Sequence, residues 1–263
     1  MLYPELLYYE THEHESNKEW VLLVHGAGGS TRTWKRQVES IGSYYNLLII
    51  DLPGHGKNAG RLLMPTIYTF KNVSQKIWQV VDHLRIQSLH LVGISLGTVI
   101  CLQMRLLRPQ NVITVIMPGA IVKLNSKLKF LANMSLALAK IIGYPAFYKL
   151  SARIMMPRSN HKKSRDVFIK ESKALTDDEY RKWTALYFGL NKTLKKLFNA
   201  SSEIPHLLVM GDQDHLFLKP AKKFVKLHAN AMISIVPKCG HVVSIEQAQK
   251  FNEICLRFLQ KKK

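Results

Sequence analysis

The pentapeptide Gly93-Ile94-Ser95-Leu96-Gly97 constrains the fold of this chain more than any other stretch. Residues 88–92 before it have the apolar character of a buried strand, and the apolar residues after it recur with helical spacing. Ser95 is therefore predicted to lie at a strand-to-helix junction. Such a tight turn holds its central residue in a strained conformation, and glycine two positions to either side avoids a collision between neighbouring elements. The pattern predicts a turn that exposes the Ser95 hydroxyl.

Strand and helix patterns alternate over most of the 263 residues, which predicts an α/β fold with a mostly parallel central sheet and helices on both faces. Besides residues 88–93, the predicted strands are Leu6–Thr11, Trp20–Val24, Asn46–Asp51, Val112–Met117, His206–Met210 and Met232–Val236. The predicted helices include Trp34–Ser43, Val73–Leu84, Thr98–Arg108, Lys219–Ala229 and Glu246–Leu259. The chain is long enough for one such domain with an insertion.

Residues 119–195 interrupt this alternation with helical periodicity and no convincing strand. We therefore expect a core domain made of residues 1–118 and 196–263, with a helical cap (lid) inserted between the two parts. Residues 119–200 carry seventeen Lys or Arg against five Asp or Glu, which is +12 of the formal net charge of +20. Such an excess either attracts anionic partners or makes a solvated, solubilising surface, and the second explanation is the commoner one.

Composition narrows the function classes further. No run of about 18 apolar residues is present, and the acidic N-terminal stretch lacks the pattern of a secretory signal. The three cysteines, an odd number without a CxxC pair, indicate neither a disulfide framework nor a metal site, so we expect a cytoplasmic protein without a metal. No nucleic-acid-binding motif is found, and we expect no nucleic-acid partner.

A glycine-rich loop follows the strand that ends at Val24. Its sequence, His25-Gly26-Ala27-Gly28-Gly29, lets backbone amides approach a ligand closely, and it matches neither a Walker loop nor a dinucleotide fingerprint. The Ala27 amide is one candidate donor to an oxyanion. The Leu96 amide, at the start of the helix after Ser95, is the other.

Several polar residues lie at predicted strand ends. Asp51 and His55 occur around Pro53 and two glycines, where polar side chains usually bind loop amides, so we expect a structural role for both. Asp212, Asp214 and the loop that contains His241 follow the last two predicted strands. Among the eleven histidines, His241 is distinguished by its place in a glycine-containing loop after a strand.

Taken together, these features resemble the α/β-hydrolase superfamily, in the branch of single-domain enzymes with a helical cap inserted after the sixth strand of the family fold. The likeness rests on the glycine-rich loop at 25–28, the segment Asp51-Leu52-Pro53-Gly54-His55-Gly56, the Ser95 pentapeptide and the loops of Asp214 and His241, which occur in the family's order. It covers nearly the whole chain except residues 119–195.

The resemblance implies a role for each matching residue. Ser95 would be the nucleophile, His241 the general base and Asp214 its orienting acid, with the Ala27 and Leu96 amides as the oxyanion hole. The family's spacing favours Asp214 over Asp212. We further expect five neighbouring residues to contact the substrate, namely Gly26, Gly28, Pro118, Leu216 and Val242.

The identity of the nucleophile selects the chemistry. An aspartate would be needed for dehalogenase or epoxide hydrolase reactions, whereas Ser95 favours acyl transfer. We therefore expect a cofactor-independent esterase-like hydrolase that cleaves a small-molecule carboxylic ester, thioester or lactone through an acyl-Ser95 intermediate.

Three alternatives stay open. In a lyase or synthase of the menaquinone-pathway type, the three residues would act as an acid-base set, although the arginine usual after the elbow is replaced by Thr98. A non-catalytic ligand-binding sensor could keep the pocket. A lipase could bind an anionic membrane surface through a basic amphipathic helix over 121–142, although such a stretch more often packs on the core. The sequence does not indicate an oligomeric state.

Overall fold

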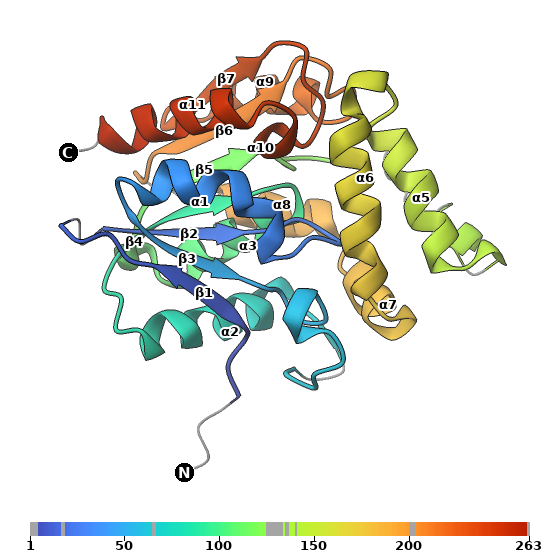
Figure 1. Cartoon of the computed structure of the whole chain (residues 1–263). Helices are drawn as coiled ribbons and strands as arrows, with labels where there is room; N and C mark the ends of the chain where they lie inside the picture. The colour runs from blue at the N-terminus through green and yellow to red at the C-terminus, as the bar shows by residue number, and fades with distance from the viewer. Residues whose placement is uncertain are drawn as a thin grey trace.

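One sheet with the strand order β1-β3-β2-β4-β5-β6-β7 runs through the computed structural model (Figure 1). The structure describes residues 5–16, 19–64, 67–124, 134, 137–139, 141–199 and 203–261. The strands are β1 (Tyr9–His12), β2 (Trp20–Val24), β3 (Asn46–Ile50), β4 (Leu89–Gly93), β5 (Val112–Pro118), β6 (His206–Gly211) and β7 (Ala231–Val236). Only β1 pairs antiparallel, with β3, and the other neighbours in the sheet are parallel. The predicted mostly parallel α/β fold is confirmed.

The central strands are apolar along their whole length because both faces of the sheet are covered. Every residue of β3, β4 and β6 is buried, whereas the edge strand β1 is partly exposed. Opposite sides of the strands contribute to two cores. Val21, Leu23 and Ile49 belong to one core, and Leu22 and Leu48 belong to the other.

Helices pack on each face. The core that contains Val21 also includes residues of α1 (Lys35–Gly42), α10 (Val243–Glu246) and α11 (Ala248–Gln260). The core that contains Leu22 includes residues of α2 (Phe70–His83), α3 (Leu96–Leu107), α8 (Leu190–Asn199) and α9 (Leu218–Leu227). The final helix, predicted over 246–259, is two elements, because Gln247, with φ −131° and ψ 54°, has a non-helical backbone between α10 and α11.

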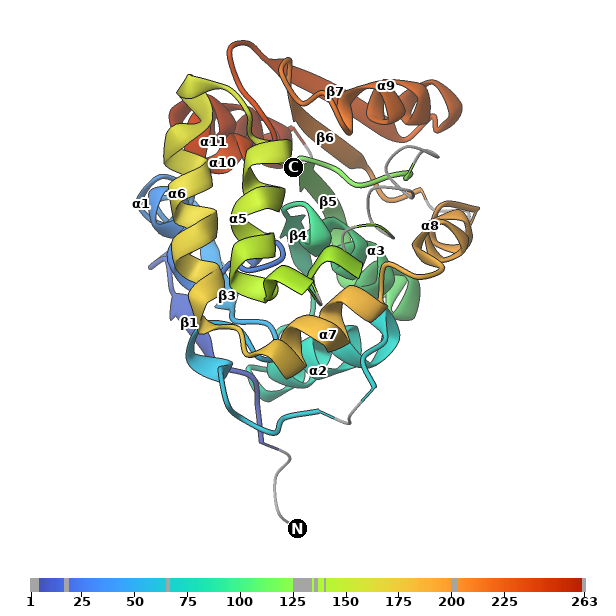
Figure 2. The same cartoon turned by 90° about the vertical axis from the view of Figure 1, so that its right-hand side faces the viewer.

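Between β5 and β6, the described elements are all helical. They are α5 (Tyr144–Met155), α6 (Lys162–Glu171) and α7 (Asp177–Ala185), followed by α8 of the core face. In Figures 1 and 2, α5, α6 and α7 lie together at one end of the sheet. The amphipathic helix expected over 121–142 falls largely outside the described residues. Among the described residues, no helix combines the length and the apolar character needed to cross a membrane.

This end of the sheet is where the parallel strands finish. The segments after Val24, Ile50, Gly93, Gly211 and Val236 leave the sheet there, since parallel strands share one carboxyl edge. All the sequence motifs described above follow one of these strand ends. The α5–α7 helices cover the edge at which they meet.

Candidate active site

Ser95 occupies the strained turn that its sequence predicts. Its φ of 54° and ψ of −114° lie outside the conformations that L-residues prefer, between the end of β4 and the first residue of α3. A β-carbon on Gly93 would overlap the carbonyl group of Gly97, and one on Gly97 would lie 2.9 Å from the His25 carbonyl oxygen. Both glycines are therefore required by close backbone approach.

Two backbone amides near Ser95 are available to a ligand. Leu96 is the first residue of α3, so its amide has no acceptor within the helix. Among the described residues, neither this amide nor that of Ala27 donates to a backbone acceptor. The glycine-rich loop packs directly on the turn, since a β-carbon on Gly26 would lie 3.2 Å from the Ser95 β-carbon. The two predicted oxyanion donors thus belong to segments in contact.

Ser95, His241 and Asp214 form a continuous hydrogen-bond chain. His241 Nε2 lies 3.0 Å from Ser95 Oγ, and His241 Nδ1 lies 2.8 Å from Asp214 Oδ2. Because a carboxylate only accepts, Nδ1 carries a proton and Nε2 is free to accept the Ser95 proton. The three residues come from the ends of three different strands, β4, β7 and β6.

Asp214 is almost fully buried, at 2% exposure. Burial alone would raise its pKa, but the adjacent His241 and hydrogen bonds from His241 and the Phe217 and Leu216 amides hold that pKa below the ordinary value. Asp212 instead accepts the Cys239 amide at 3.1 Å. The structure therefore brings Asp214, and not Asp212, to the imidazole.

The loops around Ser95 are held by Asp51 and two buried histidines. Asp51 accepts the Thr31 and Lys57 amides at 2.6 and 2.8 Å. His25 Nε2 accepts the Leu52 amide at 3.0 Å, and His55 Nε2 accepts the Gly28 amide at 3.0 Å. Asp51 and His55 thus bind loop amides, as expected from their positions.

Burial changes the protonation of both histidines. It lowers the pKa of His25 to about 4 and, with the nearby His25, the pKa of His55 to about 3. Both rings are therefore neutral at pH 7.

A cavity of about 50 Å³ opens beside Ser95 and His241. The other lining residues come from four places. They are the glycine-rich loop and the 3-10 turn that follows it (Gly26, Ala27, Gly29, Thr33), the β4–α3 turn (Ile94), the insertion (Met155, Ser164, Val167, Phe168) and the segment after His241 (Val242, Ser244, Ile245). As far as the structure describes it, the lining is mostly apolar and includes no Lys or Arg. Such a cavity suits a small, uncharged organic group.

Two of the five residues expected to contact substrate, Gly26 and Val242, line this cavity. The other three do not. Gly28 faces Tyr148 and Ser172 of the insertion, the Pro118 carbonyl accepts the Ser95 amide at 3.2 Å, and the Leu216 amide donates to Asp214.

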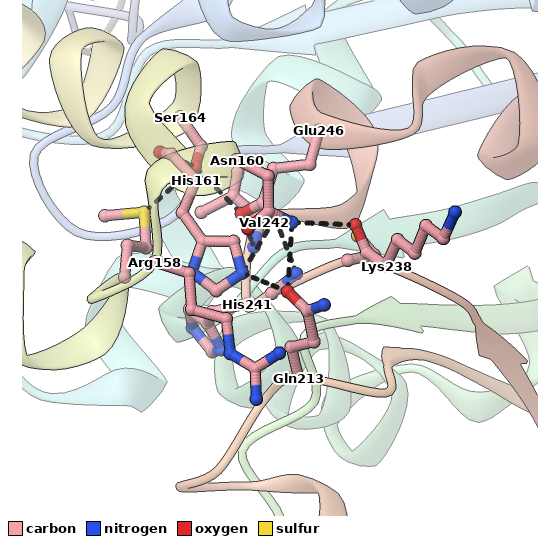
Figure 3. A network of polar contacts seen from close by, with 12 residues as sticks. Arg158, Asn160, His161, Ser164, Gln213, Lys238, His241, Val242 and Glu246 are labelled. Carbon is pink, nitrogen blue, oxygen red and sulfur yellow. Dashed lines mark hydrogen bonds and ion pairs between the residues drawn. The ribbon is translucent and has the colours of Figure 1, made fainter.

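Sequence reasoning did not identify which residues of the insertion contribute to this site. Met155, Val167 and Phe168 line the cavity, and Ser164 also reaches the core through Glu246 (Figure 3). No motif marks these residues, because apolar positions on α5 and α6 have the same helical spacing whether they face a core or a cavity.

Comparisons with known proteins identify the family of this chain. Residues 21–254 match the model of the alpha/beta hydrolase family, and the chain belongs to that family. It is 24% identical to RutD of Yersinia enterocolitica, described as a candidate carbamate hydrolase, over 96% of this chain and 92% of the relative.

A second relative has a different described activity. The chain is 25% identical to a Bacillus subtilis protein described as a candidate 2-succinyl-6-hydroxy-2,4-cyclohexadiene-1-carboxylate synthase, over 92% of this chain and 90% of the relative. Among solved structures, the esterase EaEST from Exiguobacterium antarcticum superposes with a TM-score of 0.79 at 17% identity, over 97% of this chain and 95% of the other. Its likeness supports the fold.

Proposed function

We propose that this protein is a serine hydrolase that cleaves a carboxylic ester, or a related thioester or lactone, through an acyl-Ser95 intermediate. The observation that carries the proposal is the hydrogen-bond chain from Ser95 Oγ through His241 to Asp214, at 3.0 and 2.8 Å. A serine hydroxyl is a weak nucleophile unless a neighbouring base accepts its proton.

The proposed reaction proceeds in two halves. His241 Nε2 takes the Ser95 proton while Ser95 Oγ attacks the substrate carbonyl carbon, and the carbonyl oxygen becomes an oxyanion held by the Ala27 and Leu96 amides. His241 then gives the proton to the leaving oxygen or sulfur, and the acyl group stays on Ser95. A water molecule, deprotonated by His241, attacks the carbonyl carbon of this ester. The bond from that carbon to Ser95 Oγ then breaks, His241 returns the proton to Oγ, and the acid is released. Asp214 keeps the imidazole in the required tautomer throughout.

The lining of the cavity supports a neutral acyl group of modest size. We propose that the insertion, residues 119–195, acts as a cap that sets substrate choice, because Met155, Val167 and Phe168 line the cavity. Among the described residues that line the cavity, no Lys or Arg is present to pair with an anionic substrate. We therefore assign the basic residues of the insertion to a solvated surface.

A fluorophosphonate probe tests the proposal, because it phosphonylates an activated serine. The wild-type protein should be labelled on Ser95, as located by peptide mass spectrometry, and Ser95→Ala should lose both the label and about 10⁶ in turnover. Ser43→Ala is the control, since that serine is exposed and donates to the Glu39 carbonyl. Equal labelling of Ser95→Ala and the wild type would disprove the assignment.

A synthase function is the second candidate, favoured by the likeness to the Bacillus subtilis relative. In that reaction the triad would move protons without forming an acyl-enzyme. The position after Gly97 is Thr98, which is buried and donates to the Gly93 carbonyl, where the resemblance to such synthases would call for an arginine. Mass spectrometry after rapid acid quenching separates the two, because only the hydrolase accumulates an acyl group on Ser95.

A further inference from the structure

A cluster of polar side chains joins the insertion to the loops of the proposed triad (Figure 3). At its centre is Glu246, the last residue of α10, whose side chain is 2% exposed. Its Oε2 accepts the Gly240 amide at 2.5 Å, and its Oε1 lies 3.3 Å from the Val242 amide. These amides flank His241, so one carboxylate holds the backbone on both sides of the imidazole.

The insertion supplies two further neighbours of this carboxylate. Ser164 Oγ of α6 lies 2.8 Å from Glu246 Oε1, although 82 residues separate the two. His161 Nε2 lies 3.8 Å from Oε2, and both His161 and Ser164 are completely buried. A carboxylate removed from water requires donors such as Ser164, because an incompletely bonded buried charge is costly.

The same stretch of the insertion also contacts the loop of Asp214. His161 Nε2 lies 2.8 Å from the side-chain oxygen of Gln213, the residue immediately before Asp214. Asn160 donates to that oxygen at 2.9 Å and to the Lys238 carbonyl at 3.0 Å. Residues 160–164 thus contact both the loop of the acid and the loop of the base.

Close packing makes this arrangement specific. A β-carbon on Gly240 would lie 2.8 Å from His161 Nε2 and 3.0 Å from Glu246 Oε2. Only glycine at position 240 therefore allows the His241 loop to lie so near to both side chains.

We propose that Glu246 is a positioning residue for His241, held in place from the insertion by the hydrogen bond from Ser164. The proposal rests on the proposed function for the role of His241. Glu246 acts through the backbone of the His241 loop, because a general base must stay within hydrogen-bond reach of the proton it accepts. The insertion thereby helps to set the reactivity of Ser95 as well as the shape of its cavity.

The first test is the variant Glu246→Gln, which keeps the size of the side chain and removes one hydrogen-bond acceptor. We expect kcat to fall by about 10- to 100-fold with little change in KM, since a misplacement of about 1 Å can cost 10²-fold. Unchanged kcat in a folded variant would overturn the proposal.

Two matched substitutions control for charge and for docking of the insertion. Glu253→Gln removes an exposed carboxylate on α11 that pairs with Lys250. Glu179→Gln removes a buried carboxylate of the insertion that bonds the Tyr68 hydroxyl at 2.7 Å, away from the His241 loop. Both variants should keep kcat near the wild-type value. If Glu179→Gln lost as much kcat as Glu246→Gln, the loss would be explained by weakened docking of the insertion and not by the position of His241.

A double-mutant cycle tests whether Ser164 works through Glu246. Ser164 also lines the cavity, so Ser164→Ala alone could act on the substrate directly. We expect the losses in kcat from Ser164→Ala and Glu246→Gln to be far from additive, because the two groups share one hydrogen bond. Additive losses would overturn the role of Ser164.

Proton NMR tests the position of His241 in the absence of substrate. The proton between His241 Nδ1 and Asp214 should give a downfield resonance, assigned by its loss in His241→Gln. We expect it to broaden or disappear in Glu246→Gln and in Ser164→Ala, and to stay in Glu179→Gln. An unchanged resonance in both of the first two variants would overturn the proposal.

These outcomes separate the inference from the proposed function. If wild-type Ser95 is not labelled by the fluorophosphonate, the proposed function fails, and the NMR comparison still tests the positioning of His241. If Ser95 is labelled and Glu246→Gln keeps its kcat and its resonance, only the inference fails. If Glu246→Gln does not fold, the resonance of Ser164→Ala decides.

Discussion

The carboxylate of Asp214 lies 2.8 Å from Nδ1 of His241, and its other oxygen accepts the Phe217 amide at 3.0 Å. Asp214→Asn should therefore lower turnover by about 10⁴, because an amide stabilises the wrong imidazole tautomer. Asp212→Asn keeps an oxygen for the Cys239 amide and should have a much smaller effect. Hydrolysis of p-nitrophenyl acetate by the two variants measures the difference, and a larger loss at Asp212 would reverse the assignment.

Acid should destabilise the protein below about pH 6.5, the ordinary pKa of histidine. Burial lowers the pKa of His90 and His206 to about 4, as it does for His25, and that of His55 to about 3. Between pH 6.5 and these values, the unfolded chain therefore binds more protons than the folded chain. The stability that the neutral histidines contribute is complete above pH 6.5 and decreases as the pH is lowered below it. The slope is up to about 1.4 kcal/mol per pH unit for each histidine.

Urea unfolding from pH 8 to pH 4.5 measures this slope. His90→Gln is expected to flatten it by up to one histidine's contribution. A stability that rises as the pH falls from 6.5 would contradict the prediction.

Phe168 should limit the length of the acyl group, because it lines the cavity beside Ser95. We expect Phe168→Ala to move the chain-length optimum of kcat/KM toward longer esters in a p-nitrophenyl series from acetate to decanoate. Phe188→Ala is the matched control, since Phe188 is 63% exposed. The same chain-length profile in Phe168→Ala and wild type would show that the acyl group binds elsewhere.

Substrate charge should have little influence on the rate. The insertion is strongly basic, but none of the described residues that line the cavity is Lys or Arg. We expect neutral short-chain esters to be hydrolysed at least as well as anionic ones at every salt concentration. A preference for anionic esters that fades as ionic strength rises through about 0.1 M, where the screening length is about 10 Å, would place the basic residues at the entrance.

Gly93 should not tolerate a side chain. A β-carbon there would overlap the Gly97 carbonyl and lie 2.6 Å from Cys101 Sγ, so Gly93→Ala should lose at least about 1–3 kcal/mol of stability by overpacking. At Gly42 the nearest atom to such a carbon is Leu47 Cδ1 at 3.4 Å, and Gly42→Ala should be neutral or slightly stabilising. Thermal unfolding compares the two variants. Equal melting temperatures for Gly93→Ala and wild type would contradict the turn geometry.

The sequence by itself determined the features that depend on neighbouring residues. The spacing of Gly93, Ser95 and Gly97 predicts the turn between strand and helix, and the apolar runs predict strands buried on both faces. These features can be predicted from the sequence because strand and helix periodicity, and the steric requirements of a tight turn, depend on only a few neighbouring residues. The choice of Asp214 over Asp212 already needed the resemblance to a family, since both follow the same strand.

Only the tertiary structure decided which residues meet across the carboxyl edge of the sheet. The final helix, which the sequence predicts to start at Glu246, is broken at Gln247, and Glu246 turns back to bind both amides beside His241. Ser164 reaches that carboxylate from 82 residues earlier in the chain. Nothing in the local pattern around Ser164 marks it, because its partner is set by how the insertion packs on the sheet rather than by its neighbours in sequence.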